Sequence, residues 1–533
     1  MKKLLLTASL LILGASISFA QLYQGEFAVG GTNIEECYAM VQSADGGYVF
    51  TGYTQSYADP VNGAMYVCKL DYAGNLAWTR TIDGKYGTVG FAITQLNDKG
   101  FAVVGSTTSF GDTAAEDVYI VKLDSMGNFK WSRTIGGPNT DRGDAVIQDK
   151  AGDIVIGGYT SSFGPGQSNF YLIKLDISGN LKWAKAIGGS IFDAAYALAQ
   201  TTDGGYVLTG FTTSYGDTVY GDIYVVKVDS AGNFKWGRSV GGGSYEVGSG
   251  IAATKDGGCI ATGYTNSYGA GASDVYIIKL DSVGNVKWTK VIGGKNDDYG
   301  NSIVQTADGG YAVSGLTSSY NDTINSDAYL VKLDAGGNVK WTKTYGGNNS
   351  DESNSLVQTY DWGYALAGET NSFGAGNFDM YLVKTDSNGG SCSSHSAGGA
   401  VTSGGMVDSG GVVVNGGAIT SVDSGRVSNG GVYTNVCSVI TSVNDITPEE
   451  NGIEVYPNPS NGVFIFQANS QWLLANSKVE VYNVLGEKVY AQSFNIQNSE
   501  FKIDLIGQPN GIYIYKVVDK SGTIIARGKL VVE

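Results

Sequence analysis

Carboxylate side chains recur at one place in this sequence, and carboxylates can bind a cation, accept hydrogen bonds from hydroxyl groups or transfer a proton. Each stands four residues after the second residue of a Gly-Gly turn. The set consists of Glu35, Asp141, Asp193, Glu246, Asp298 and Asp351, and only the second unit departs from it, with Thr88. If the turn ends an outer strand, these residues begin an inner strand and ring the mouth of a central channel.

Two interpretations of this ring stay open. An acidic ring could hold a cation, with Ca²⁺ the natural candidate, or a hydroxyl-rich ligand. Alternatively, each carboxylate accepts hydrogen bonds from nearby backbone N–H groups or pairs with a lysine that recurs in every unit and needs a partner if it is buried. We favour the structural interpretation, and we expect neither a metal site nor an obligatory cofactor. The lysines are Lys69, Lys122, Lys174, Lys227, Lys279, Lys332 and Lys384.

A tryptophan follows each of the first six of these lysines by nine residues. The tryptophans are Trp78, Trp131, Trp183, Trp236, Trp288 and Trp341, and they recur every 52 or 53 residues. A residue repeated in every unit solves a problem that every unit shares, so we expect these side chains to pack one unit against the next. An aromatic platform for sugars is the alternative.

The repeated unit reads as four short strands, of which the third, as in DVYIIKLD, is apolar on both faces. Such a strand belongs to a sheet that is covered on both sides. The seventh unit lacks its fourth strand, and YQGEFAVGG near the N-terminus can supply it. We therefore predict an all-β fold in which residues 21–387 form a seven-bladed β-propeller closed by the N-terminal strand.

The phrase KLDxxGNxKW resembles the tryptophan-docking repeat of quinoprotein-type propellers. Whole units such as DGGYVLTGFTTSYGDTVYGDIYVVKVDSAGNFKW resemble secreted bacterial propellers that have no assigned activity. The resemblance covers residues 21–387 and implies a fold rather than a function. Quinoproteins bind a quinone and Ca²⁺, but this chain lacks their adjacent cysteines and their eighth blade.

Residues that break the repeat are the better candidates for binding. In the turns after Gly-Gly, unrepeated aromatic and charged residues fall on one side of the ring and suit contact with carbohydrate or protein. These candidates are Tyr86, Arg142, Phe192, Tyr245, Asp297 and Tyr299. A varied surface without function is the alternative.

Catalysis finds little support in the sequence. The only histidine, His395, lies outside the repeats, which excludes histidine-based triads and zinc sites within them. We predict no catalytic residue and no enzymatic activity. The alternative is an enzyme acting on polysaccharide through the channel-mouth carboxylates.

The chain has 533 residues and a formal net charge of −16, an acidic balance that disfavours nucleic acid as a partner. Residues 1–20 read as a signal peptide, and no later segment predicts a transmembrane helix. We expect an exported monomer. Residues 388–442 are rich in Gly, Ser and Val and form either a flexible spacer or a strip of very short strands. Cys392 and Cys437 bracket this segment and could form a disulfide.

The region 443–533 has alternating apolar residues and turns that predict a small β-sandwich. It closely resembles the C-terminal sorting domain of the type IX secretion system. The matching residues are Tyr456, Pro457, Asn458, Pro459, Asn461, Gly462, Gly486, Gly511, Tyr513 and Lys529. The resemblance implies export through that secretion machinery, followed by release or attachment at the outer-membrane surface. It leaves open whether the domain is then cleaved.

Together these features predict a secreted or cell-surface binding or adhesion protein whose partner is an extracellular polysaccharide or protein. A polysaccharide-active enzyme and a scaffold without a small ligand are the alternatives.

Overall fold

The computed structural model describes residues 25–111, 115–320, 325–392, seven short strands between 395 and 435, and residues 453–468, 475–483, 488–495, 500–518 and 524–532. The predicted signal peptide lies outside these residues. The described secondary structure consists of strands, which confirms the all-β class. No helix in the described part of the chain is long and apolar enough to cross a membrane. The chain divides into two units, Met1–Cys437 and Ser438–Glu533.

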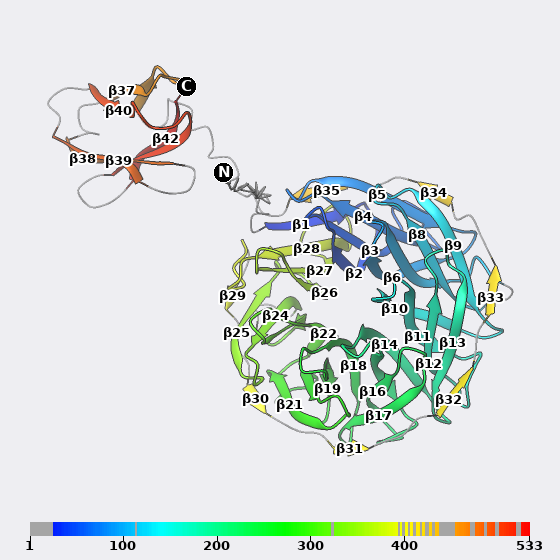
Figure 1. The fold of residues 1–533 in the computed structure, drawn as a ribbon. Helices are drawn as coiled ribbons and strands as arrows, with labels where there is room; N and C mark the ends of the chain where they lie inside the picture. Colours follow the sequence, from blue (N-terminus) through cyan, green and yellow to red (C-terminus); the bar gives the residue numbers. More distant parts are fainter. Residues whose placement is uncertain are drawn as a thin grey trace, which may run out of the picture. The chain divides into compact units, whose positions relative to one another are not determined.

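The first unit contains seven sheets, numbered here from 1 to 7 in chain order (Figure 1). Each sheet contains four antiparallel strands of the repeat. We number them first to fourth from the innermost strand to the outermost. The first strands are β2 (Glu35–Gln42), β6 (Thr88–Gln95), β10 (Asp141–Gln148), β14 (Asp193–Gln200), β18 (Glu246–Ala253), β22 (Asp298–Gln305) and β26 (Asp351–Gln358). The second strands are β3 (Tyr48–Thr54), β7 (Phe101–Thr107), β11 (Ile154–Thr160), β15 (Tyr206–Thr212), β19 (Cys259–Thr265), β23 (Tyr311–Thr317) and β27 (Tyr364–Thr370).

The third strands are buried on both faces, as their sequences predict. They are β4 (Ala64–Leu70), β8 (Asp117–Leu123), β12 (Asn169–Leu175), β16 (Asp222–Val228), β20 (Asp274–Leu280), β24 (Asp327–Leu333) and β28 (Asp379–Thr385). The fourth strands are β5 (Leu76–Asp83), β9 (Phe129–Gly136), β13 (Leu181–Gly188), β17 (Phe234–Gly241), β21 (Val286–Gly293), β25 (Val339–Tyr345) and, in sheet 7, β1 (Gly25–Gly30). The N-terminal strand β1 pairs antiparallel with β28, so the two ends of the repeat region meet in one sheet.

A fifth strand covers the outer edge of each sheet, and all seven come from the Gly-rich segment that follows the repeats. We call this segment the belt. In chain order its strands are β29 (His395–Ser396), β30 (Ala400–Thr402), β31 (Met406–Asp408), β32 (Val412–Asn415), β33 (Ala418–Ser421), β34 (Arg426–Ser428) and β35 (Val432–Asn435).

The belt runs backwards around the ring, from β25 of sheet 6 to β5 of sheet 1, and ends on β1 of sheet 7 (Figure 1). Of the two alternatives left open by the sequence, these residues form short strands. Each occupies an edge that would otherwise expose unpaired backbone groups. Cys392, just before the belt, is disulfide-bonded, while Cys37, Cys68 and Cys259 are free and buried. Cys437, the predicted disulfide partner of Cys392, lies outside the described residues.

Neighbouring sheets are joined by hydrophobic clusters and by two repeated hydrogen bonds. The N–H of Asp141 donates to the carbonyl of Glu116 in the preceding sheet (2.7 Å), and Gln148 Oε1 accepts from Asn97 N in the turn of that sheet (2.6 Å). Sheets 7 and 1 repeat this pattern, with Glu35 N bonded to Phe378 O (2.8 Å) and Tyr360 N to Gln42 Oε1 (3.3 Å). The same two hydrogen bonds therefore also occur between sheets 7 and 1.

Each recurring lysine forms an ion pair with an aspartate of its own sheet. Its partner is the aspartate of the turn between the first and second strands, as in Lys279–Asp256 (2.9 Å) and Lys332–Asp308 (3.0 Å). The third unit has Ala151 in that turn, and there Lys174 bonds Asp149 instead (2.7 Å). The lysines are thus balanced by turn aspartates, and the channel-mouth carboxylates have other partners.

The second unit has a sheet of β36 (Ile453–Tyr456), β37 (Val463–Ala468) and β40 (Glu500–Asp504). Its other sheet orders β39 (Lys488–Asn495), β38 (Ala475–Asn483), β41 (Gly511–Val518) and β42 (Ile524–Val532). Phe464, Phe466 and Ile503 from the first sheet and Val479 and Val517 from the second form one buried cluster. Two sheets sharing one core are what the alternating apolar residues predict.

Candidate functional site

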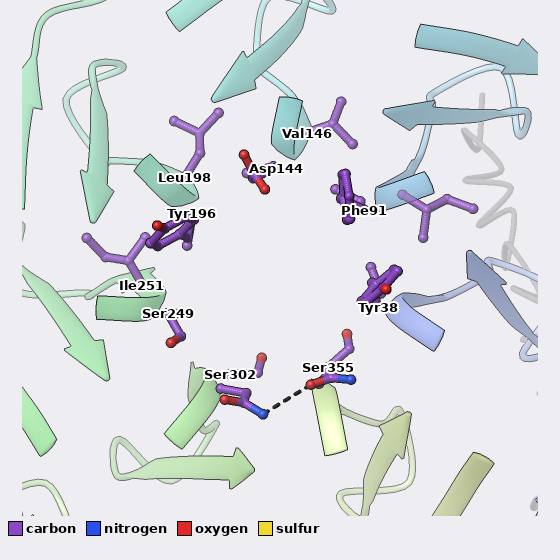
Figure 2. Close-up of a pocket in the computed structure, with 18 of the residues that line it drawn as sticks. Tyr38, Phe91, Asp144, Val146, Tyr196, Leu198, Ser249, Ile251, Ser302 and Ser355 are labelled. Carbon is purple, nitrogen blue, oxygen red and sulfur yellow. Dashed lines mark hydrogen bonds between the residues drawn. The ribbon is translucent and has the colours of Figure 1, made fainter. Parts of the chain in front are cut away.

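The first strands of the seven sheets surround a cavity of about 420 Å³ (Figure 2). Each strand carries a β-bulge between its third and fifth residues, for example between Gly143 and Ala145 in β10. The bulge lets consecutive residues reach the lumen, whereas a regular strand would present alternate ones. Positions four to six therefore line the cavity in most sheets, as Tyr38, Ala39 and Met40 do in sheet 1.

The fourth position of the first strand differs from unit to unit. Around the ring it is occupied by Tyr38, Phe91, Asp144, Tyr196, Ser249, Asn301 and Asn354. The side chains fall into two arcs, and in Figure 2 Phe91 and Asp144 of the first arc lie across the lumen from Ser249 of the second. Sheets 1 to 4 contribute three aromatic rings and one carboxylate, and sheets 5 to 7 contribute hydroxyl and amide groups. The wall of the cavity thus has aromatic rings and the charged pair Asp144–Arg142 on one side and uncharged polar groups on the other.

Asp144 is the charged group of the cavity with spare hydrogen-bonding capacity. Its side chain is only 6% exposed, and one oxygen, Oδ1, accepts a hydrogen bond from Arg142 (2.7 Å). The other oxygen, Oδ2, is buried and has no hydrogen-bond partner among the described residues. Burial raises the pKa of Asp144 to about 6, against the opposing charge of Arg142. A ligand that donates a hydrogen bond to Oδ2 would relieve this cost.

The Arg142 guanidinium lies over the ring of Phe91, 3.6 Å from its centroid. Phe91 in turn contacts Tyr38, with ring centroids 5.2 Å apart. Arg142 is thereby fixed between an aromatic face and a carboxylate, an arrangement that suits its planar, delocalised charge. Together these side chains form one contiguous part of the cavity wall.

The polar arc is tied together across sheet boundaries. Asn301 Nδ2 donates to Asn354 Oδ1 (3.1 Å), the bond drawn in Figure 2. Asn354 Nδ2 donates to the carbonyl of Cys37 (3.1 Å), which links sheet 7 to sheet 1. Ser302 and Ser355 accept hydrogen bonds from backbone N–H groups of the following sheet. Amide and hydroxyl groups held in place in this way are suited to hydrogen-bond a polar ligand.

Three glutamates lie beside the join between sheets 7 and 1. Glu36 accepts a hydrogen bond from the hydroxyl of Tyr38, and Glu352 accepts one from Asn354 Nδ2 (3.2 Å). Burial and the charges of Glu352 and Glu36 raise the pKa of Glu369 to about 9. Glu369 therefore holds a proton at neutral pH. Among the described residues, no group of three or more His, Cys, Asp or Glu side chains is arranged to hold a metal ion.

The residues predicted to bind ligand occupy different places. Arg142 lies in the cavity wall, as described. Tyr86 and Tyr245 are each 48% exposed in the turns before the first strands of sheets 2 and 5. Phe192 contacts Phe211 with centroids 6.2 Å apart, and Tyr299 contacts Tyr264 at 4.7 Å. Asp297 is partly exposed, and its backbone carbonyl accepts a hydrogen bond from Ser318 N (2.8 Å). The structure does not bring the six together at one point.

The channel-mouth carboxylates are buried and do not line the cavity. Asp298, which is 0% exposed, accepts hydrogen bonds from Gly294 N (2.7 Å), Ser319 Oγ (2.7 Å) and the hydroxyl of Thr317. Glu35, Asp141, Asp193, Glu246 and Asp351 accept equivalent bonds from the second glycine of the turn. In sheet 2, Thr88 instead donates to Ile82 O (2.6 Å). These contacts favour the local structural role that we expected.

The repeated tryptophans contact the neighbouring sheet. Trp183 meets Tyr206 with centroids 6.4 Å apart, and Trp341 meets Tyr364 at 5.8 Å. Trp236 donates from Nε1 to Ser282 O in the next sheet (3.2 Å). These contacts lie on the interfaces between sheets, where packing was expected.

Sequence reasoning missed Asp144 and the other residues at the fourth position of the first strand. A signal for them was present, because this position, three residues beyond the repeated carboxylate, changes in chemical class from unit to unit. The search for breaks in the repeat was confined to the turns and did not extend into the strand.

In the second unit, the YPNP motif is bound to the last strand. Asn458 Nδ2 donates to Lys529 O (2.6 Å), and Asn458 Oδ1 accepts from Val531 N (2.8 Å). The hydroxyl of the buried Tyr513 donates to Pro509 O (2.6 Å). Asn458 and, through its N–H to Val531 O (2.9 Å), Ser460 thus join the motif to β42. Gly486 lies outside the described residues.

A known protein family matches the second unit. Residues 454–533 match the family model of the secretion system C-terminal sorting domain. Regulatory protein FlaEY of Caulobacter vibrioides is 28% identical over 141 residues, which cover 22% of this chain and 15% of that protein. The chain therefore corresponds to a small part of that relative.

Among solved structures, two similar ones cover most of this chain at low identity. PorZ of Porphyromonas gingivalis, described as a surface component of the type IX secretion system, has 13% identity and a TM-score of 0.39 over 95% of this chain and 60% of its own. The extracellular domain of BT4673 from B. thetaiotaomicron has 10% identity and a TM-score of 0.40 over 94% and 57%. Values this low carry no argument about function. The sorting domain, by contrast, identifies the chain as a protein exported by type IX secretion to the cell surface or the extracellular space.

Proposed function

We propose that residues 21–387 form a closed seven-bladed β-propeller and that the belt surrounds it. Support comes from the pairing of β1 with β28 and from the hydrogen bonds between sheets 7 and 1, which repeat those at the other boundaries. The first strand of sheet 1 contacts those of both sheet 2 and sheet 7. A closed ring removes the two free sheet edges that an open array would expose.

We propose that this ring is the binding module of an exported surface protein and that its ligand is a neutral carbohydrate. The observation that carries the proposal is the unpartnered, buried Oδ2 of Asp144 in a cavity that also contains three aromatic rings. Sugars present hydroxyl donors beside apolar ring faces, so a carboxylate acceptor, amides and aromatic rings together match them. A protein partner would instead need an exposed surface, and a cavity of about 420 Å³ offers little of one.

An enzyme acting on polysaccharide is the second candidate. The channel-mouth carboxylates accept hydrogen bonds from backbone N–H and hydroxyl groups, so they are poor candidates for acid–base catalysis. Asp144 is the carboxylate that favours this alternative, because its pKa of about 6 would allow it to exchange a proton near neutral pH. Glycoside hydrolysis needs a second carboxyl group on the other side of the scissile bond. Glu116 is a candidate for that role, because its charge contributes to the raised pKa of Asp144.

Titration calorimetry of the mature chain against neutral oligosaccharides tests the binding proposal. Asp144→Asn keeps an acceptor for Arg142 and removes the charge, and we expect it to weaken binding by about tenfold or more. Asp281→Asn makes the same change in the outer hairpin between β20 and β21 and should leave binding unchanged. Equal affinity of the Asp144→Asn variant and the parent would refute the proposed site. Release of shorter sugars during incubation would favour the enzyme.

A further inference from the structure

Aromatic side chains continue outwards from the cavity on sheets 4 to 6. Tyr264, on the second strand of sheet 5, contacts Tyr299 on the first strand of sheet 6, with ring centroids 4.7 Å apart. Tyr220, in the loop before β16, contacts Tyr245 in the turn before β18 at 5.4 Å. We call Tyr220, Tyr245, Tyr264 and Tyr299 the aromatic track. Its outer members Tyr220 and Tyr245 are 43% and 48% exposed, beside Val219 at 73%.

The track is connected to the cavity. Tyr299 is the second residue of β22, and Asn301 on the same strand lines the cavity. Tyr245 directly precedes β18, whose Ser249 also lines the cavity. The track therefore lies at the starts of two strands that form the cavity wall.

The repeat itself does not require these residues. The position of Tyr245, just before the repeated carboxylate, holds Ile34, Gly87, Thr140, Phe192, Asp297 and Ser350 in the other units. The position of Tyr299, just after the carboxylate, holds Glu36, Val89, Arg142, Ala194, Val247 and Glu352. Packing between sheets is therefore achieved without tyrosine at either place. Large rings exposed on one sector of the rim are typical of a contact surface.

We propose that a neutral oligosaccharide chain binds with its end in the cavity and its following residues along the aromatic track. This inference rests on the proposed function of the cavity and assigns the outer subsites. Tyrosine suits them because each ring offers an apolar face to the sugar ring and a hydroxyl to its polar edge. We expect the oligosaccharide to be neutral rather than anionic. Glu36 and Glu352 lie beside the cavity, and the protein's net charge of −16 repels anions.

The oligosaccharide leaves the cavity over one sector, because the described residues of sheet 2, on the opposite side, form no such track. In sheet 2 the position of Tyr245 is Gly87 and that of Tyr299 is Val89. Tyr86, one residue earlier, is also 48% exposed, and it packs against its own neighbour Lys85, with Nζ 5.0 Å from the ring centroid. Tyr86 and Tyr245 thus form a matched pair with equal exposure in different sectors.

Calorimetry with linear neutral oligosaccharides of increasing length, beginning with the monosaccharide, tests the track. We expect Tyr245→Ala and Tyr220→Ala to weaken binding of the longer chains by at least tenfold and to leave the shortest binding ligand unaffected. Tyr86→Ala, the matched control, should change neither. Asp144→Asn should weaken every length, because it acts on the subsite that all of them occupy.

The two proposals fail in different ways. If Asp144→Asn weakens all lengths but Tyr245→Ala and Tyr220→Ala weaken none, the cavity binds sugar and the track is refuted. The track is also refuted if these variants weaken all lengths equally, or if Tyr86→Ala matches them. If the parent binds no member of the series, or Asp144→Asn binds every member as the parent does, the proposed function itself is overturned.

Discussion

Asp379 and Glu35 place two carboxyl groups side by side at the boundary between sheets 7 and 1, and replacing Asp379 with Asn should stabilise the protein. Asp379 is 1% exposed and Glu35 is 0% exposed. A Cβ atom built on Gly30 would lie 1.7 Å from Asp379 Oδ1 and 2.8 Å from Glu35 Oε2, so both oxygens crowd the same point. Asp379 Oδ2 accepts from Ala375 N (2.9 Å) and Gly376 N (3.1 Å), whereas Oδ1 has no hydrogen-bond partner in the described structure.

The size of the effect follows from the pKa of Asp379. Burial, with a further contribution from the charge of Glu35, raises this pKa from 3.8 to about 6. One pKa unit corresponds to about 1.4 kcal/mol, so the ionised form costs about 3 kcal/mol in the folded state. Because the folded state holds the proton more tightly than the unfolded state, this cost is absent below pH 3.8. It grows as the pH rises through 6 and is complete above it.

Asp379→Asn removes this cost. The amide oxygen can accept the bonds from Ala375 and Gly376, and the amide nitrogen can donate towards Glu35. Sheet 3 has an uncharged amide at the equivalent position: Asn169, 0% exposed, begins β12, and its Nδ2 donates to Phe163 O (3.1 Å). We expect the variant to gain up to about 3 kcal/mol over the parent at pH 8 and nothing below pH 4.

Urea unfolding of both proteins between pH 4 and pH 8 measures this difference directly. The reciprocal change Asn169→Asp should introduce a loss of stability that grows with pH in the same way. The loop before Asn169 carries Pro165 where the loop before Asp379 carries Ala375, so the introduced carboxylate would lack one backbone donor. A variant Asp379→Asn with the parent's stability at pH 8, or with a gain independent of pH, would refute the reasoning.

Three further changes have defined outcomes. Glu369→Gln should raise Tm relative to the parent by an amount that grows between pH 5 and pH 9. Burial and the charges of Glu352 and Glu36 make the folded parent hold a proton on Glu369 in this range. Scanning fluorimetry measures the difference in Tm, and a difference that stayed constant with pH would indicate a packing effect instead. Trp236→Ala should cost about 3–5 kcal/mol in urea unfolding, since Trp236 is 8% exposed, whereas Trp362→Ala, at 63% exposure, should stay within about 0.5 kcal/mol. A chain truncated after residue 387 should associate through its uncovered sheet edges while one truncated after 437 stays monomeric, and light scattering that found both monomeric would contradict this role of the belt.

The sequence predicts the strands of the ring well because their signal is local and repeated. The third strand of each unit, such as Asp274–Leu280, is apolar at successive positions, and it is buried throughout. The regular distance between tryptophans indicates one sheet per unit, and the structure has that arrangement. Seven copies of one pattern let each copy support the assignment of the others.

The cavity lining was harder to predict, and part of it depends on the bulge. A regular strand beginning at buried Asp141 would present Arg142, Asp144 and Val146 to the lumen by simple alternation. The bulge between Gly143 and Ala145 shifts the register, so that Ala145 reaches the cavity as well. Nothing in the local sequence marks this irregularity, and no sequence period shows that Asp144 faces Tyr38 or Asn301 across the ring.

The belt was left as two alternatives for a related reason. Its strands have two to four residues each, which is too short to indicate a strand by sequence pattern alone. They are strands because the fourth strand of each sheet offers a free edge, and those edges lie far away in the sequence. The phrase Val412–Asn415, for example, pairs with Lys185–Gly188 in sheet 3.

The bulge also explains how one fold can carry a variable site. The fourth residue of each first strand stands at the bulge and takes no part in the residue pairing on either side of it, as Asp144 does in β10. It points to the lumen, whereas the buried Asp141 on the same strand holds the turn through its bond from Gly137 N (2.7 Å). Substitutions at the fourth position therefore change the cavity while leaving the ladder and the turn in place, although Asn354 also links sheet 7 to sheet 1 through its bond to Cys37 O. The repeat can stay constant at the turns and the ladders, while the residues that face the cavity vary from sheet to sheet.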